Sequence, residues 1–262
     1  RRPVASGLYG GVKDLAGQVR VAYDDQFLYL AARIADQVVR NSHREPGEVW
    51  AGDALWVGLK WSGGETAGYD FIYGFSPGDG AAVPPVAALF NRFGAAAGVV
   101  SKAQLAVERR EDGYNLEVAI PLSEFVPQAG ETGRPLALSD GQTLTVDFVL
   151  YDSDQASGAT TKEKMLGWAC QTDRYDSTQG GKLVVGPVAP PGERILNAPR
   201  ATGLTVDGKL GDWEALSARQ ARIGERSAVM TDAASGPSLD DLLYPAPPEG
   251  AGHFDLRGER FA

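Results

Sequence analysis

Apolar and polar residues alternate through much of the first two thirds of the sequence. Within residues 27–34, for example, Leu28, Leu30 and Ile34 all lie on one side of an extended chain. A period of two residues is typical of a β-strand with one buried face. The same alternation predicts strands at residues 18–24, 53–61, 69–75, 102–108, 114–120, 143–151 and 182–185. No long helical pattern separates these segments, so we predict an all-β fold, an antiparallel β-sandwich that ends near Val188.

The composition excludes several classes of protein. The chain has 262 residues, a formal net charge of −9, one cysteine and two histidines. A single cysteine excludes an intramolecular disulfide framework, and two histidines far apart in the sequence disfavour a zinc site. The negative charge argues against nucleic acid as a partner. No apolar run approaches the roughly 18 residues of a membrane-spanning helix, so we expect no membrane insertion.

The sequence changes character after the predicted sandwich. Residues 189–203 contain prolines and are typical of a linker, and a weak helical pattern is confined to residues 213–221. Residues 231–252 are rich in Pro, Gly, Ser and Asp and show no period, which is unusual for a loop inside a compact domain. We therefore divide the chain into a domain at residues 1–188, the linker, and a separate region at residues 204–262.

Several short segments occur together in a fixed order. They are residues 21–30 (VAYDDQFLYL), 34–36 (IAD), 50–55 (WAGDAL), 113–121 (GYNLEVAIP) and 152–154 (DSD), then Trp168 and residues 181–184 (GKLV). This ordered set, which covers about residues 10–187, is similar to that of the carbohydrate-binding module family 9-like domains. Those domains are β-sandwiches of jelly-roll type, related in shape to DOMON domains. The resemblance implies a noncatalytic module in an extracytoplasmic protein (secreted, cell-surface or periplasmic), with a poly- or oligosaccharide as its partner.

One piece of the family pattern stands at the other end of the chain. Family members open with a strand and turn of the type Val-Asp-Gly-x-x-Asp-x-Trp, and a segment of this type stands here at residues 206–213 (VDGKLGDW), with Asp212 directly before Trp213. Residues 255–260 (DLRGER) also echo residues 14–19 (DLAGQV). Either the chain holds one module and the head of the next repeat, or the head folds back to supply a missing first strand. We favour the first interpretation because residues 189–203 are typical of an interdomain spacer.

Two aromatic residues are candidates for sugar binding. In sugar-binding members of the family two aromatic rings sandwich the sugar; the resemblance places Trp50 at the first ring and Tyr175 near the second. Such a pair can hold a pyranose by its apolar C–H faces with little loss of rotamer entropy. Three polar strand positions of the family are replaced here by Trp56, Ile72 and Gly74. This departure supports the alternative function, a structural or interaction module that has lost sugar binding and contacts neighbouring repeats.

An aromatic stripe gives two further candidates. Tyr69, Phe71, Tyr73 and Phe75 fall on one face of a predicted strand. A sandwich core is the use that we favour for this stripe, and a ligand groove that includes Trp56 and Tyr73 is the alternative.

Three aspartates are candidates for a metal site. Asp152 and Asp154 are close in sequence, and Asp147 stands on the preceding predicted strand. Carboxylate oxygens are the ligands that Ca²⁺ prefers, and calcium sites occur in some relatives, so Ca²⁺ is the one cofactor that we consider. The alternative is that the Asp-Ser-Asp run forms a turn through side-chain to backbone hydrogen bonds.

No catalytic constellation is evident in the sequence. Glycosidases need two carboxylates across a cleft, and Glu117 lies on the polar side of its predicted strand with nothing that marks a second carboxylate. The sequence also lacks a phosphate-binding loop. We therefore predict that the chain is not an enzyme.

Overall fold

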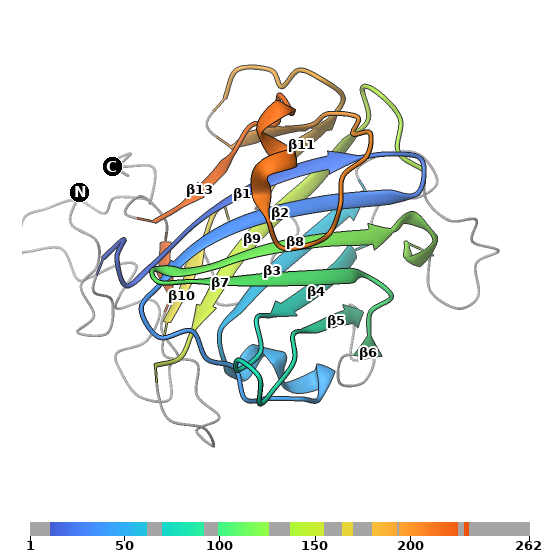
Figure 1. The fold of residues 1–262 in the computed structure, drawn as a ribbon. Helices are drawn as coiled ribbons and strands as arrows, with labels where there is room; N and C mark the ends of the chain where they lie inside the picture. The colour runs from blue at the N-terminus through green and yellow to red at the C-terminus, as the bar shows by residue number, and fades with distance from the viewer. Residues whose placement is uncertain are drawn as a thin grey trace, which may run out of the picture.

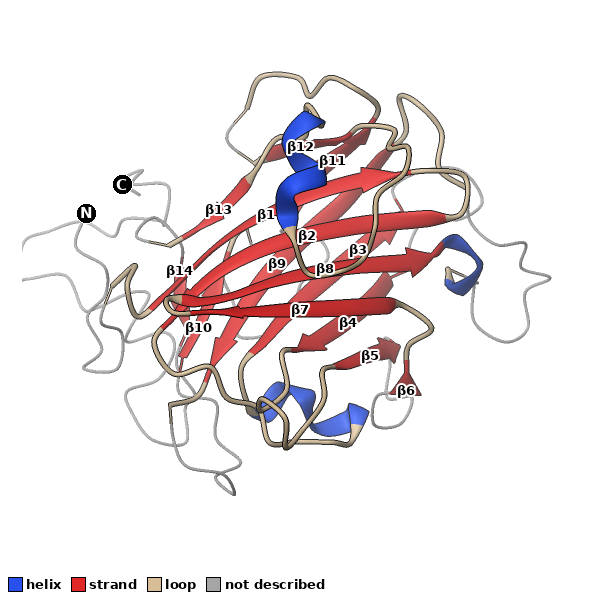
Figure 2. Cartoon of the chain, in the orientation of Figure 1, coloured by secondary structure: helices blue, strands red, loops and turns tan. Residues whose placement is uncertain are grey.

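Two β-sheets pack face to face in this protein, and the few helical turns lie outside them (Figure 1, Figure 2). The computed structural model describes residues 11–61, 70–91, 99–125, 137–154, 164–169, 180–192, 194–224 and 228–230. The prediction of an all-β sandwich is confirmed. The one parallel pair among the described strands joins β11 and β12.

Within the described residues, the first sheet has five antiparallel strands in the order β13-β1-β2-β8-β7. Its strands are β1 (Leu15–Tyr23), β2 (Phe27–Asp36), β7 (Gln104–Arg110), β8 (Gly113–Pro121) and β13 (Ala221–Ile223).

The second sheet contains nine strands in the part of the chain that the structure describes, and its main path runs in the order β12-β11-β9-β3-β4-β5-β6. These strands are β3 (Ala54–Trp61), β4 (Asp70–Ser76), β5 (Val86–Asn91), β6 (Val99–Val100), β9 (Thr143–Asp152), β11 (Gly181–Val185) and β12 (Ile195–Ala198). Off this path, β10 (Lys164–Gly167) pairs with β9, and β14 (Ala228–Met230) pairs with β10.

The alternating residues predicted for β2 form part of the core between the two sheets. Leu28, Leu30 and Ile34 are fully buried there. Burial of a leucine or isoleucine side chain contributes about 1.5–3 kcal/mol, so the inward face of each long strand stabilises the sandwich. The alternation is a consequence of the pleat, which sends successive side chains to opposite faces.

The aromatic stripe on β4 belongs to this core. Phe71, Tyr73 and Phe75 are buried, and the rings of Tyr73 and Phe75 are stacked with centroids 5.8 Å apart. The core use of the stripe is therefore confirmed for these three residues, and Tyr69 lies outside the described residues. The groove interpretation is wrong for Tyr73, because its side chain faces inward whereas that of Trp56 lies on the outer face of the same sheet.

Residues beyond Val188 extend both sheets, contrary to the boundary that we predicted there. β12 adds to the second sheet beside β11, and β13 adds to the first sheet beside β1. Between them, the 3₁₀ helix η4 (Leu210–Ala215) lies across the outer face of the first sheet (Figure 1). The helical pattern predicted at residues 213–221 is wrong, since only this short 3₁₀ turn forms before β13. β12 and β13 are four and three residues long, too short to show a period of two.

Candidate functional site

Trp50 stands at the surface on a short 3₁₀ helix, η1 (Pro46–Ala51), which precedes β3. Pro46 begins the helix, where its fixed φ and missing N–H are tolerated. Val49 and Ala51 are buried beneath it, whereas the side chain between them, that of Trp50, keeps 36% of its surface exposed. The backbone under the indole is therefore anchored, and part of the ring remains accessible.

Asn41 holds the segment that carries Trp50. Its side-chain Nδ2 donates to the carbonyl oxygens of Val49 and Asp53, at 3.0 Å in each case, and its Oδ1 accepts from the N–H of His43 at 3.1 Å. Asn41 is itself buried, so these bonds satisfy a polar group that would otherwise be costly. Gly52 packs so closely that a Cβ there would lie 2.7 Å from Asn41 Cγ. No pattern in the amino-acid sequence predicts this role of Asn41.

Further hydrogen bonds fix the loops beside η1. The guanidinium of Arg109 donates to the carbonyl oxygens of Val39 at 2.9 Å and of Gly78 at 2.7 Å. Arg44 donates to the carbonyl of Ala82 at 2.7 Å. These bonds join residues far apart in the sequence, so the loops around Trp50 are cross-linked to one another by hydrogen bonds. Tyr175, the second ring of the expected pair, lies outside the described residues, and its distance from Trp50 stays untested.

A second aromatic group lies on the outer face of the second sheet. The ring of Trp56 stacks on Phe90 with centroids 4.6 Å apart and meets Tyr151 edge-on at 5.2 Å. Gly74, the register partner of Trp56 on β4, makes room for these rings, because a Cβ there would approach Phe90 to 3.3 Å. Trp56 and Tyr151 also pack against buried Val149 and Met165. These half-buried rings form an apolar patch on the outer face of the second sheet.

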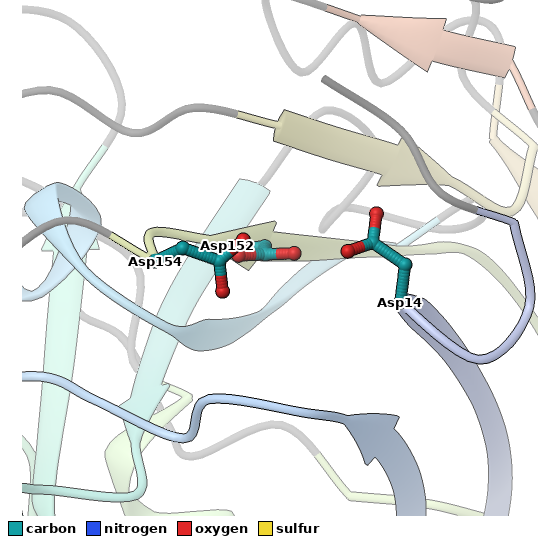
Figure 3. A group of neighbouring side chains, drawn as sticks. All are labelled: Asp14, Asp152 and Asp154. Atoms are coloured by element: carbon teal, nitrogen blue, oxygen red, sulfur yellow. The ribbon is translucent and has the colours of Figure 1, made fainter. Parts of the chain in front are cut away.

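Three aspartates converge at one end of the sandwich. One carboxylate oxygen from each of Asp14, Asp152 and Asp154 lies within 4.8 Å of the others. Figure 3 shows Asp14, just before β1, facing Asp152 at the end of β9, with Asp154 beside it. Such carboxylate oxygens are hard ligands suited to Ca²⁺. The prediction is right in placing Asp152 and Asp154 together, and it missed Asp14.

Asp147 does not join this group. It stands five residues before Asp152 on β9, so the pleat sends the two side chains to opposite faces of the sheet. Its Oδ1 instead accepts hydrogen bonds from the N–H groups of Phe148 and Ala169, both at 2.8 Å. We therefore correct the predicted metal set by replacing Asp147 with Asp14.

Further buried carboxyl groups lie close to the aspartate group. Asp36 and Asp53 are also buried at this end of the sandwich. Burial, and then the charges of Asp36 and Asp152, raise the pKa of the Asp53 carboxyl well above its usual value, although N–H donors from Arg40 and Ser153 oppose the shift. Burial and the same carboxylates raise the pKa of Tyr114. A bound cation would offset this repulsion.

Glu117 accepts hydrogen bonds from the C-terminal part of the chain. Its Oε2 accepts hydrogen bonds from the N–H groups of Asp207 at 3.0 Å and Gly208 at 2.7 Å. Its Oε1 accepts from the indole N–H of Trp213 at 2.8 Å. Residues 204–213 thus contact a strand of the first sheet, which is what the folded-back arrangement requires. Both oxygens of the Glu117 carboxylate therefore accept hydrogen bonds from this segment.

Comparison with known proteins gives a family match. The profile of the family described as carbohydrate family 9 binding domain-like matches residues 4–185. No curated protein matches the chain. Among the described residues, no helix is long and apolar enough to cross a membrane.

Several solved structures show a distant similarity. One is a family 9 carbohydrate-binding module from Caldicellulosiruptor kristjanssonii in complex with cellotriose, with 15% identity, 71% of this chain and 76% of that chain covered, and a TM-score of 0.46. A module from the same organism in complex with glucose has 12% identity, coverages of 74% and 86%, and a TM-score of 0.43. A putative carbohydrate-binding protein from Bacteroides uniformis has 13% identity, coverages of 64% and 77%, and a TM-score of 0.45.

The profile match spans more than half of the chain and includes the η1 segment and both long hairpins of the first sheet. The chain therefore belongs to the carbohydrate family 9 binding domain-like family.

Proposed function

We propose that this chain is a noncatalytic carbohydrate-binding module that holds a sugar ring against Trp50, with Tyr175 as the second aromatic surface. The observation that carries the proposal is the partly exposed indole of Trp50 on a buried, hydrogen-bonded support. An aromatic face that is already fixed loses little entropy when a pyranose packs its C–H groups on it. Family membership supports the class of ligand and the absence of a reaction, and it favours an extracytoplasmic location.

Polar groups near η1 can orient a sugar. His43 Nδ1 lies 3.4 Å from Glu48 Oε2, and Glu48 belongs to the same helix as Trp50. Sugar hydroxyls need such donors and acceptors beside an apolar surface, and a small number of them gives specificity. We assign hydroxyl recognition to His43 and Glu48.

The Trp56 patch supports a second candidate function. Trp56 stands at a position where the family resemblance implies a polar side chain, and this change suits contact with another protein surface, such as a neighbouring repeat. Under this alternative the chain is a structural or interaction module without sugar affinity. Trp56 is then the contact residue.

We also propose that Asp14, Asp152 and Asp154 hold a Ca²⁺ ion. The convergence of three carboxylates from two segments far apart in sequence supports this assignment. The ion would tie the start of β1 to the end of β9, so its role is to stabilise the sandwich.

Calorimetric titration distinguishes the two functions. The wild type should bind at least one of glucose, cellotriose and xylo-oligosaccharides, and Trp50→Ala should weaken that binding tenfold or more. Trp50→Phe, which keeps an aromatic face, should retain part of the affinity, and Trp56→Ala serves as the matched control on the other aromatic group. Binding that is lost in Trp56→Ala but kept in Trp50→Ala would contradict the proposed site. No heat with any sugar would favour the interaction module.

A further inference from the structure

The C-terminal segment at residues 195–223, called here the arm, adds only to the margins of the sandwich. β12 is the outermost strand of the second sheet's main path, and β13 is the outermost strand of the first sheet. β14, which follows the arm, likewise pairs beyond β10. If the arm and β14 left together, the described strand pairs among the remaining strands, called here the body, would be kept. The arm is therefore removable without breaking the ladders of the body.

The body presents a specific receptor for the arm. Trp213 is 2% exposed and lies on the outer face of the first sheet. The floor of this receptor consists of Ala22, Tyr29, Ala31 and Ala119. Three of these four are alanines, which leave a shallow space that an indole can fill. Glu117 adds three hydrogen bonds, and Arg20 donates to the carbonyl of Trp213 at 3.2 Å. The receptor therefore recognises particular residues of the arm by hydrogen bonds as well as by apolar packing.

The connection between body and arm has the composition of a hinge. Residues 186–192 contain Pro187, Pro190 and Pro191, and Val188 is 73% exposed. Proline-rich segments favour extended, semi-rigid conformations that direct a chain away from its own domain. This segment lies at the surface and contributes little to the packed core.

We propose that the arm is exchanged between copies of this chain, so that the receptor around Glu117 takes the Val206–Trp213 segment of a second copy. The contacts would be the same within one chain and between two, so only the hinge conformation and the protein concentration separate the two forms. The partner is thus a second copy of this chain, and the product is a dimer joined by reciprocal arms.

A complementation experiment tests the proposal. Glu117→Ala damages the receptor and keeps the arm, whereas Trp213→Ala damages the arm and keeps the receptor. One variant is isotopically labelled, the two are unfolded and refolded together, and dimers are counted by native mass spectrometry. Exchange predicts at least tenfold more mixed dimer than dimer of either variant alone, because only the mixed pair restores one complete contact. A mixed dimer no more abundant than the others would overturn the proposal.

Shortening the hinge gives an independent test that leaves both contact surfaces intact. Deletion of residues 187–192 leaves three residues between β11 and β12, and these reach at most about 14 Å. The connection must reverse twice to lay β12 parallel to β11, which so few residues cannot do. We expect the deletion variant to be dimeric by light scattering, and Glu117→Gln added to it should reduce the dimer. A folded monomer would overturn the proposal, and the complementation experiment decides the matter if the deletion variant does not fold.

Discussion

Trp213 donates its indole N–H to the carboxylate of Glu117 at 2.8 Å, a bond that joins the C-terminal arm to the middle of the first sheet. Both groups are buried. The bond holds the arm against the outer face of the first sheet. It is one of three hydrogen bonds from the arm that the Glu117 carboxylate accepts.

Trp213→Phe should destabilise the protein. The substitution keeps an aromatic ring in the receptor but removes one donor from a buried carboxylate, and an unsatisfied group of this kind costs about 1–3 kcal/mol. Trp213→Ala should cost more, about 3–5 kcal/mol, because it also leaves a cavity. Urea unfolding followed by fluorescence and circular dichroism measures both values. Equal losses for Phe and Ala would show that the hydrogen bond contributes more than the packing of the ring.

Glu117 should make stability depend on pH. Burial raises its pKa above the ordinary value of 4.5, the nearby charge of Asp212 adds to the rise, and the N–H donors of Asp207, Gly208 and Trp213 oppose it. The folded protein then holds this proton more tightly than the unfolded chain. The contribution is complete below pH 4.5 and is lost as the pH rises through the raised pKa.

Glu117→Gln removes this titration and serves as the comparison. The free energy of unfolding of the wild type should fall relative to that of Glu117→Gln as the pH is raised from 4 to 7. Chemical unfolding at several pH values measures the difference between the two. Parallel curves for the two proteins across this range would contradict the assigned direction of the shift.

Calcium should raise the thermal stability of the wild type. A ligand that binds only the folded state, at 100 times its Kd, stabilises by about 2.7 kcal/mol. Asp152→Asn should weaken this effect strongly, because it removes a central charge from the group of three. Asp147→Asn is the matched control on the same strand and should keep the calcium response. Differential scanning calorimetry with and without Ca²⁺ decides, and an equal response in all three proteins would contradict the site.

Gly52→Ala should disturb the support of Trp50. The added Cβ would lie 2.7 Å from Asn41 Cγ and 3.0 Å from its Cα, so the loop must shift, at a cost of about 1–3 kcal/mol. We expect weaker sugar binding together with a lower melting temperature. Gly211→Ala is the control, because nothing lies within 4 Å of a Cβ at that position. Unchanged sugar affinity in Gly52→Ala would show that the Asn41 contact does not position Trp50.

The long strands and their buried faces could be predicted from local sequence. The alternation in β2 and the aromatic stripe in β4 identified core residues such as Leu30 and Phe75, since the pleat fixes which side chains share a face. The same reasoning could not pair Trp56 with Phe90, because a strand's own pattern does not name its neighbour. It also left a ligand groove open as the alternative for Tyr73, and only the packing of the two sheets shows that this side chain faces the core.

The sequence by itself determined that this chain is a β-sandwich of its family and that Trp50 precedes a core strand. The tertiary structure alone decided that Asp14 meets Asp152 and Asp154, and that the arm returns to Glu117. A period of two residues is a local property that depends on the pleat of a single strand. Contacts between residues far apart in the sequence depend on sheet order and register, which are set by the packing of the whole sandwich.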